Sequence, residues 1–375
     1  MINQERIIAD FMGLVQINSP TKNERQIADL LTDRLTQFGC TVDEDRAGEK
    51  IGGNAGNLIA YLPGTMPNAP VLLLGAHMDC VSPCENVRPQ RKDGRITSSG
   101  DTILGADDKA GIAAILEALQ TVEEQQLPHG DIQIVFSIAE EGGLYGAKHI
   151  DRSLLKASFG YELDSSGRPG EIITKAPGQN QIKITIHGKA AHAGIAPESG
   201  INAITIAATA IAQLRQGRID EETTANIGVI HGGIATNIVP DLVEVICEAR
   251  SRNLKKMQMQ TEYMCEAFKQ AAEVNGAKAI IDLEKKYDPY VLSEEASTVK
   301  IACQAAKAAN LAPRFESTGG GSDANFFNLY GIETAVIGIG MQKCHTTEEF
   351  IEEEDLCNTA NWVVENIKPT AKATK

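Results

Sequence analysis

Histidine and carboxylate side chains occur in short segments whose spacing could bind divalent metal ions. The first segment, Gly75-Ala76-His77-Met78-Asp79, directly follows the apolar run Val71–Leu74. His77 and Asp79 are two residues apart, so on an extended chain both side chains point the same way. The carboxylate of Asp79 could then orient a metal-binding imidazole of His77. A histidine and an aspartate on a surface beside a strand would show the same spacing. This pair alone therefore does not distinguish a metal site from a surface pair.

Two adjacent acids, Asp107 and Asp108, stand between small residues in the segment Gly105–Gly111, just before a helical pattern. An aspartate at a helix start usually caps the helix, and we expect this role for Asp108. Asp107 has room around its carboxylate to bridge two cations.

Two consecutive glutamates, Glu140 and Glu141, follow the apolar run Gln133–Ile138. At the end of a buried strand they would repel each other unless a positive charge lies beside them. A metal ion supplies that charge, so one glutamate can bind the ion while the other, with a raised pKa, serves as general base. Solvated acids in a loop are the alternative explanation.

Asp164, in Tyr161-Glu162-Leu163-Asp164, and His345, in Lys343–Glu349, extend the set. Each of these segments alone is more often structural. Together the segments offer two histidines and three carboxylates as ligands, a mixed nitrogen and oxygen set without thiolates. Such a set suits a pair of zinc ions, whereas a purely structural zinc site usually includes cysteine thiolates.

The elements that must position these residues follow from the apolar pattern. Helical spacing covers 4–15, 24–38 and 109–124, and short apolar runs cover 57–61, 71–76 and 131–139. Apolar runs that alternate with helices predict a sheet buried on both faces, in the layered α/β arrangement. Catalytic groups are then expected at the ends of strands.

A different pattern begins after Ala176-Pro177-Gly178. Strand and helix signals follow in the order βαββαβ up to residue 283, which is a ferredoxin-like unit complete in itself. We therefore expect a domain inserted at 179–292. Residues 1–178 and 293–375 would form the main α/β domain, because the tail again alternates helix, strand and helix.

The ordered motifs HxD, GADDKAG, EEGG, ELD and CHTTEE resemble the aminoacylase, carboxypeptidase G and peptidase T family of co-catalytic zinc peptidases. The resemblance covers essentially the whole chain. It implies an α/β fold in which a mixed-sheet catalytic domain carries an inserted ferredoxin-like lid, which in some family members also forms a dimer. It also implies two zinc ions, with cobalt or manganese as alternatives.

The resemblance assigns a role to each residue of these motifs. His77, Asp107 and Asp164 would hold one ion, and Asp107, Glu141 and His345 the other, so that Asp107 is shared. Asp79 would lie behind His77, and Glu140 would be the general base. Cys80 departs from the threonine that often follows HxD in the family, and we do not expect it to be a ligand.

The inserted segment and the tail add candidates for substrate binding. His192, in Gly188–Gly194, stands among small residues and resembles the histidine that stabilises the transition state in the family. Asn237 and Arg250 resemble residues that bind the substrate in the family, and an arginine can bind a carboxylate through two hydrogen bonds. In the glycine-rich loop, the backbone N–H groups of Gly320 and Gly321 could bind a carboxylate or an oxyanion, although a flexible turn has the same composition.

The glycine loop and Gly105–Gly111 look most like the peptidase T branch of the family, whose members remove the N-terminal residue from tripeptides. The resemblance thus implies a metal-dependent hydrolase of small peptides. A dipeptidase, a carboxypeptidase or an N-acyl amino acid deacylase could use the same metal site. A non-catalytic peptide-binding protein is disfavoured, because every predicted ligand and the base are present.

Composition limits the remaining function classes. The 375 residues carry a formal charge of −15, which would repel a phosphate backbone, so nucleic acid is not an expected partner. No signal-like start and no apolar stretch of about 20 residues is present in the sequence, so we expect a cytoplasmic protein that does not bind membranes. The eight cysteines are expected to be reduced. A small peptide is the expected partner, together with a homodimer through the inserted domain.

Overall fold

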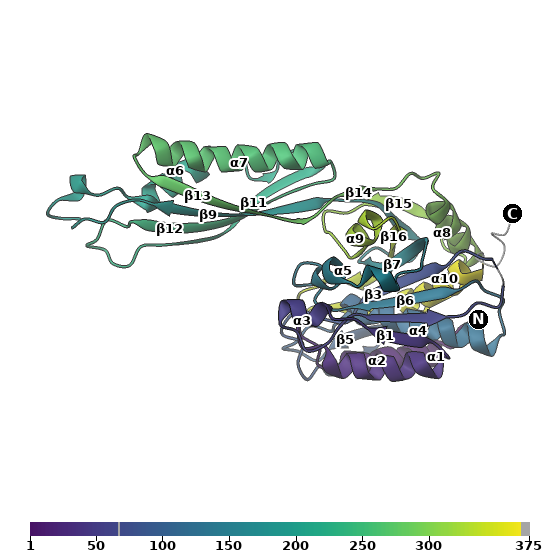
Figure 1. Cartoon of the computed structure of the whole chain (residues 1–375). Helices are drawn as coiled ribbons and strands as arrows, with labels where there is room; N and C mark the ends of the chain where they lie inside the picture. The colour runs from purple at the N-terminus through teal and green to yellow at the C-terminus, as the bar shows by residue number, and fades with distance from the viewer. Residues whose placement is uncertain (67, 369–375) are drawn as a thin grey trace. The chain divides into compact units, whose positions relative to one another are not determined.

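The structure is a computed structural model that describes residues 1–66 and 68–368 (Figure 1). The described residues divide into two compact units. Unit 1 comprises Met1–Thr174, Leu292–Ser317 and the chain from Ser322 onward, and unit 2 comprises Lys175–Val291 and Thr318–Gly321. Each unit is described by itself.

A mixed sheet forms the centre of unit 1. Its strands are β1 (Thr41–Glu44), β2 (Leu58–Leu62), β3 (Leu72–His77), β6 (Ile132–Ser137), β7 (Phe159–Ser165), β8 (Glu171–Ala176), β15 (Arg314–Ser317) and β16 (Glu333–Gly338). The order is β1-β2-β6-β3-β7-β16-β8, and β15 pairs with β8. The last two residues of β8 belong to unit 2, where they pair with β14 (Tyr290–Val291). The four central strands, β6, β3, β7 and β16, run parallel to one another.

Helices cover both faces of this sheet, which is why its central strands are buried and largely apolar. The helices are α1 (Gln4–Val15), α2 (Arg25–Gln37), α3 (Ala47–Ile51), α4 (Ala106–Glu124), α5 (Tyr145–His149), α8 (Ser297–Ala308), α9 (Ala324–Leu329) and α10 (Glu353–Ile367), with the 3₁₀ turn η1 (Arg152–Leu154). Figure 1 shows α1 and α2 below the sheet and α9 above it. Every residue of β3 and β6 is buried. Burial of one such aliphatic side chain contributes about 1.5–3 kcal/mol.

A second, smaller sheet lies at the edge of unit 1. It consists of β4 (Pro89–Lys92), β5 (Arg95–Ser98), β17 (Met341–Gln342) and β18 (Phe350–Glu352) in the order β17-β18-β5-β4. The antiparallel pairing of Phe350 with Thr97 joins segments that are about 250 residues apart in the sequence. This sheet was not predicted.

Unit 2 has the predicted βαββαβ order. Strands β9 (Gly178–His187), β11 (Thr223–Gly232), β12 (Leu242–Ser251) and β13 (Lys278–Tyr287) form an antiparallel sheet, extended by the short β10 (Gly217–Arg218). Helices α6 (Ala203–Gln213) and α7 (Leu254–Val274) lie on one face of it (Figure 1), and the 3₁₀ turn η2 (Pro197–Ser199) precedes α6. Alternate residues of β9 and β12 face these helices. They pack with Met264 and Phe268 in one apolar core.

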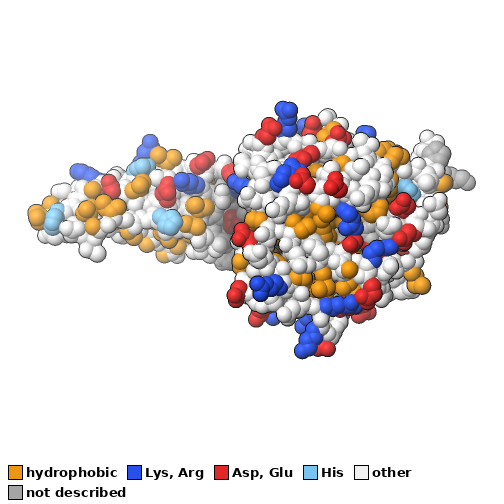
Figure 2. Space-filling model, turned by 90° about the horizontal axis from the view of Figure 1, so that it is seen from below, with side chains coloured by type: hydrophobic (Ala, Val, Ile, Leu, Met, Phe, Trp, Pro, Cys, Tyr) orange, Lys and Arg blue, Asp and Glu red, His pale blue; other side chains and the backbone are white. Residues whose placement is uncertain are grey.

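The expected α/β class with a mixed sheet is confirmed, and the predicted helices and strands occur close to their expected bounds. Among residues 1–66 and 68–368, no helix is both long and apolar enough to span a bilayer. On the face seen in Figure 2, acidic and basic side chains are interspersed.

Candidate metal centre

Three parallel strands bring the predicted motifs to one edge of the sheet. In β3, β6 and β7, His77 pairs with Ser137, and Gly75 pairs with both Val135 and Glu162. The carboxyl ends of these strands therefore meet, as is usual for sites on parallel sheets. The HxD, EEGG and ELD motifs each stand at one of these ends.

Gly75 leaves room for a buried acid within this group. A Cβ at Gly75 would lie 2.1 Å from Oε2 of Glu162 on the adjacent strand, closer than any side chain could tolerate. Glycine at this position therefore lets the Glu162 carboxylate lie against β3. Glu162 is 2% exposed and was not predicted as a site residue.

The carboxylate of Asp107 lies between the two predicted histidine ligands. Its Oδ1 is 2.9 Å from Nε2 of His77, and its Oδ2 is 3.3 Å from Nε2 of His345. Nε2 of His345 also lies 2.8 Å from Oε1 of Glu141. One carboxylate thus faces both imidazoles, which is the position that a ligand shared by two ions requires.

The ligand atoms also cluster in two overlapping groups. His77, Asp107 and Glu141 form one group, and His77, Glu140 and Asp164 form the other, with the atoms of each within 4.8 Å of one another. The two groups contain four of the five predicted ligands and the predicted base Glu140, and His345 is connected to them by its contacts with Asp107 and Glu141. Their division between two ions stays a prediction.

Asp79 holds several parts of the site together. Nδ1 of His77 is 2.9 Å from the Asp79 backbone oxygen and 3.5 Å from its Oδ1, so the backbone carbonyl makes the closer contact. The Asp79 carboxylate accepts hydrogen bonds from the Glu140 backbone N–H at 2.8 Å and from the Thr21 hydroxyl at 2.7 Å. Asp79 thereby connects the segment of the predicted base to that of the predicted ligand His77.

The backbone of Asp107 and Asp108 is not helical, so the regular part of α4 begins after Asp108, which caps it as expected. Its Oδ1 accepts a hydrogen bond from the Gly111 backbone N–H at 3.3 Å. Its Oδ2 accepts one from the His77 backbone N–H at 3.1 Å, which the sequence did not suggest. Asp108 therefore also fixes the end of β3 against the start of the helix.

Burial and close contact between carboxyl groups shift the pKa values of the residues in this site. Burial, followed by repulsion from neighbouring acids such as Asp164, raises the pKa of Glu140 well above its usual range. Burial likewise raises the pKa of Asp164, with Asp107 as the next cause. Hydrogen bonds to Asp107 and Glu141 raise the pKa of His345 to about 10. Burial opposes the charged form of His77, yet contacts with Asp107 and Asp79 outweigh it and raise its pKa well above the usual value.

The donor set fits divalent metal ions. Imidazole nitrogens and carboxylate oxygens converge, and excess buried negative charge surrounds them, which cations would neutralise. Burial raises the pKa of the nearby Cys80 thiol to about 12, and its Sγ lies 3.6 Å from the Asp107 backbone oxygen. Cys80 therefore stays a protonated packing residue rather than a thiolate ligand.

The other predicted substrate-binding residues belong to unit 2. Exposed His192 accepts hydrogen bonds at Nδ1 from the backbone N–H groups of Gly194 and Ile195, at 3.2 and 3.1 Å. The backbone oxygen of Asn237 accepts a hydrogen bond from Ala193, next to His192, at 2.9 Å. These contacts bring the segments of His192 and Asn237 together.

Arg250 and the glycine loop have partners of their own. The guanidinium of Arg250 donates to both carboxylate oxygens of Glu248, at 2.9 and 3.0 Å. The Gly320 backbone N–H donates to the Thr318 hydroxyl at 3.1 Å. A Cβ at Gly321 would lie 2.4 Å from the ring of Tyr287, so close packing explains this glycine. A role in substrate binding stays a prediction for Arg250, Gly320 and Gly321.

Several polar residues of the centre were missed from the sequence. They are the buried acids Glu24, Glu162, Asp323 and Glu349 and the partly buried Thr21. Burial raises the pKa of Asp323 to about 6, although the Ser137 hydroxyl opposes this shift. Asp323 stands in the glycine-rich motif and Glu349 in CHTTEE, so their motifs were the available signal. Thr21 had no such signal.

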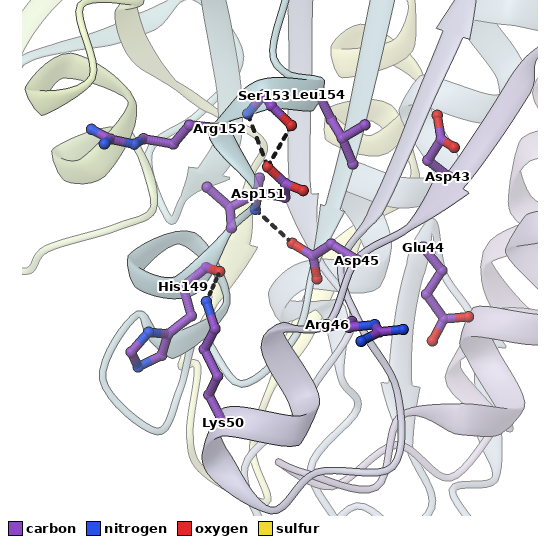
Figure 3. A pocket seen from close by; sticks show the side chains of 11 residues that line it. Asp43, Glu44, Asp45, Arg46, Lys50, His149, Asp151, Arg152, Ser153 and Leu154 are labelled. Carbon is purple, nitrogen blue, oxygen red and sulfur yellow. Dashed lines mark hydrogen bonds between the residues drawn. The ribbon is translucent and has the colours of Figure 1, made fainter.

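A polar pocket of about 570 Å³ lies elsewhere in unit 1 (Figure 3). Residues that line it form hydrogen bonds with one another. Asp45 accepts one from the Asp151 backbone N–H at 3.0 Å, and Lys50 donates one to the His149 backbone oxygen at 3.2 Å. None of the predicted site residues lines it. We assign it no function.

Comparisons with known proteins agree with this geometry. The sequence model described as peptidase family M20/M25/M40 matches residues 73–368. An uncharacterized protein of Bacillus subtilis, YqjE, is 43% identical over 99% of this chain and 100% of its own length. Peptidase T of Enterococcus faecalis is 29% identical over 76% of this chain and 70% of its own length.

Two solved structures are similar along the whole chain. Aminopeptidase PepT from Bacillus cereus superposes with a TM-score of 0.92 at 45% identity, covering 99% of both chains. A tripeptidase from Staphylococcus aureus superposes with a TM-score of 0.96 at 43% identity, covering 99% of this chain and 100% of its own.

Proposed function

Because the chain belongs to peptidase family M20/M25/M40, we propose that it is a metal-dependent aminopeptidase that removes the N-terminal residue from tripeptides. The observation that carries the proposal is the Asp107 carboxylate, whose two oxygens contact His77 and His345. Similarity to a tripeptidase at a TM-score of 0.96 supports the substrate class.

The proposed centre holds two divalent ions, zinc in the first instance, with cobalt and manganese as alternatives. His77, Asp107 and Asp164 would bind one ion, and Asp107, Glu141 and His345 the other. When bound, such ions polarise a peptide carbonyl and lower the pKa of a water molecule to about 7. The converging nitrogen and oxygen donors support a metal site here, and the contacts of Asp107 with both His77 and His345 support its role as the shared ligand.

Glu140 is the proposed general base. Its carboxyl group would take the proton of the attacking water and later give it to the amine that leaves when the peptide C–N bond breaks. A raised pKa suits this task, since the group must hold the proton between the two steps. Asp79 would keep the Glu140 segment in place through the hydrogen bond from the Glu140 backbone N–H.

His192, Asn237 and Arg250 are the proposed contacts of unit 2 with the substrate. Because two backbone N–H groups donate to Nδ1 of His192, the neutral ring carries its hydrogen on Nε2, which can donate to an oxyanion. Nη1 of Arg250 makes no hydrogen bond within the described part of the chain, and we propose it as a donor to a substrate carboxylate. The role of residues 179–292 as a lid, a homodimer through them and a cytoplasmic location belong to the same proposal.

The test is hydrolysis of one tripeptide in three forms: unmodified, N-acetylated and C-amidated. Wild type and Glu140→Gln are each loaded with two equivalents of zinc, and the released amino acids are identified. We expect wild type to release the N-terminal residue and to leave the acetylated peptide intact. Glu140→Gln should bind the same amount of zinc and lose activity by about 10²–10⁴-fold, because the general base is removed.

Other outcomes identify the alternatives. Release of the C-terminal residue would indicate a carboxypeptidase, and cleavage of dipeptides alone a dipeptidase. Cleavage of only the acyl group from acylated amino acids would indicate a deacylase. Zinc-loaded wild type that binds peptides without cutting any would indicate a non-catalytic peptide-binding protein.

A further inference from the structure

Glu349 is a buried carboxylate whose side-chain partners all lie where the loop 99–105 leads into α4. Its Oε2 accepts hydrogen bonds from the backbone N–H groups of Leu104 and Gly105, at 2.8 and 2.7 Å, and its Oε1 accepts one from Asp107 at 3.0 Å. The residue is 1% exposed. Within the described residues, no lysine, arginine or histidine forms an ion pair with it.

The pairing of two short strands places Glu349 against this loop. Strand β18 begins one residue after Glu349, and β5 ends at Ser98, shortly before the loop 99–105. Because the two strands are antiparallel and Phe350 pairs with Thr97, the start of β18 lies beside the end of β5. The carboxylate thus meets backbone groups that are 242 to 245 residues away in the sequence.

Glu349 is also tied to the segment of the second histidine. Its own backbone N–H donates to the Thr346 backbone oxygen at 3.1 Å, which closes a turn directly after His345. One residue therefore fixes the backbone of Asp107 through its side chain and the turn beside His345 through its main chain. The side chains of Asp107 and His345 meet at 3.3 Å.

We propose that Glu349 is a positioning residue of the metal centre, which sets the distance between Asp107 and His345 by holding their two loops together. The inference rests on the proposed metal site, and it assigns a role to a residue outside the proposed ligand and substrate-binding sets, whose carboxylate is bonded to backbone N–H groups. Carboxylates that orient ligands in this way typically contribute about 10–100-fold to metal affinity.

Three variants test the inference, compared with wild type. Glu349→Gln keeps the size of the side chain but turns one acceptor into a donor that faces backbone N–H groups. Glu349→Asp keeps the charge but is one methylene too short to reach the loop. Glu348→Gln is the matched control, because the exposed Glu348 pairs only with Lys343 among the described residues.

The measurements are the metal-free melting temperature, the zinc affinity by competition with a chromogenic chelator, and the visible spectrum of the cobalt-loaded protein. We expect both Glu349 variants to bind zinc about 10–100-fold more weakly and to change the cobalt spectrum. The Glu348 control should match wild type in all three measurements. Should Glu349→Gln fail to fold, Glu349→Asp carries the test.

A purely structural role gives a different result. It predicts a lower melting temperature for the metal-free Glu349 variants, with zinc affinity and cobalt spectrum unchanged, and this result would overturn the inference. Failure of wild type itself to bind two metal ions would instead overturn the proposed function, so the two failures are distinguishable.

Discussion

The hydroxyl of Thr21 donates to the Asp79 carboxylate at 2.7 Å, and Thr21→Val removes that donor while keeping the shape of the side chain. A hydrogen bond to a charged group contributes about 1.5–3 kcal/mol. Asp79 keeps a second donor, the Glu140 backbone N–H, so we expect the lower end of this range. At about 1.4 kcal/mol per factor of ten, the expected loss in kcat/KM is about 10-fold.

The assay compares zinc-loaded wild type, Thr21→Val and Thr21→Ser on the same tripeptide, at saturating and at low substrate. Thr21→Ser keeps the hydroxyl and should retain most of the activity. We expect the loss to fall on kcat, because the Asp79 carboxylate acts on the segments of His77 and Glu140 rather than on the substrate. Equal activity of the valine and serine variants would refute the reasoning, since the hydrogen bond would then contribute nothing.

Three further predictions concern stability. Removal of zinc with a chelator should abolish activity and lower the melting temperature, and added zinc should restore both in a concentration-dependent way. A melting temperature that does not depend on zinc would contradict the proposed metal site. Arg6→Ala leaves the buried Glu117 carboxylate without its cation and should cost about 2 kcal/mol in urea denaturation, less than a fully buried pair because Arg6 is 28% exposed. Lys300→Ala, in an exposed pair, is the control and should change little.

Burial raises the pKa of Glu24 to about 7 in the folded protein, while the unfolded value is about 4.3. The folded state therefore binds this proton more tightly, and the associated stability is lost as the pH rises from about 4.5 to about 7. The difference in melting temperature between Glu24→Gln and wild type should thus favour the variant more at pH 8 than at pH 5. A difference that does not change with pH would contradict the raised pKa of Glu24.

The sequence predicted most of what depends on local pattern. Strands β3 and β6 lie within the apolar runs predicted at 71–76 and 131–139, and the predicted ligand His77 is the last residue of β3. Asp108 was predicted as a cap from its position before a helix, and the structure confirms this. These features follow from spacing within a few residues of the chain.

The remaining features depend on contacts between distant segments. The small sheet was missed because β4, β5, β17 and β18 are only two to four residues long, and β4 is mostly exposed, so no apolar alternation marks it. Thr21 and Glu349 were missed because their partners lie 58 and more than 240 residues away. A lone polar residue carries no local sign that such a partner exists.

The order of the strands in unit 1 also bears on how the protein is made. Strand β16 pairs with β7 and β8, yet the whole of unit 2 separates them in the sequence. A nascent chain must therefore leave one edge of β7 open until unit 2 has been synthesised, and such long-range pairing slows folding. His345 follows β16 in the sequence, so a growing chain lacks this proposed ligand until β16 has been synthesised.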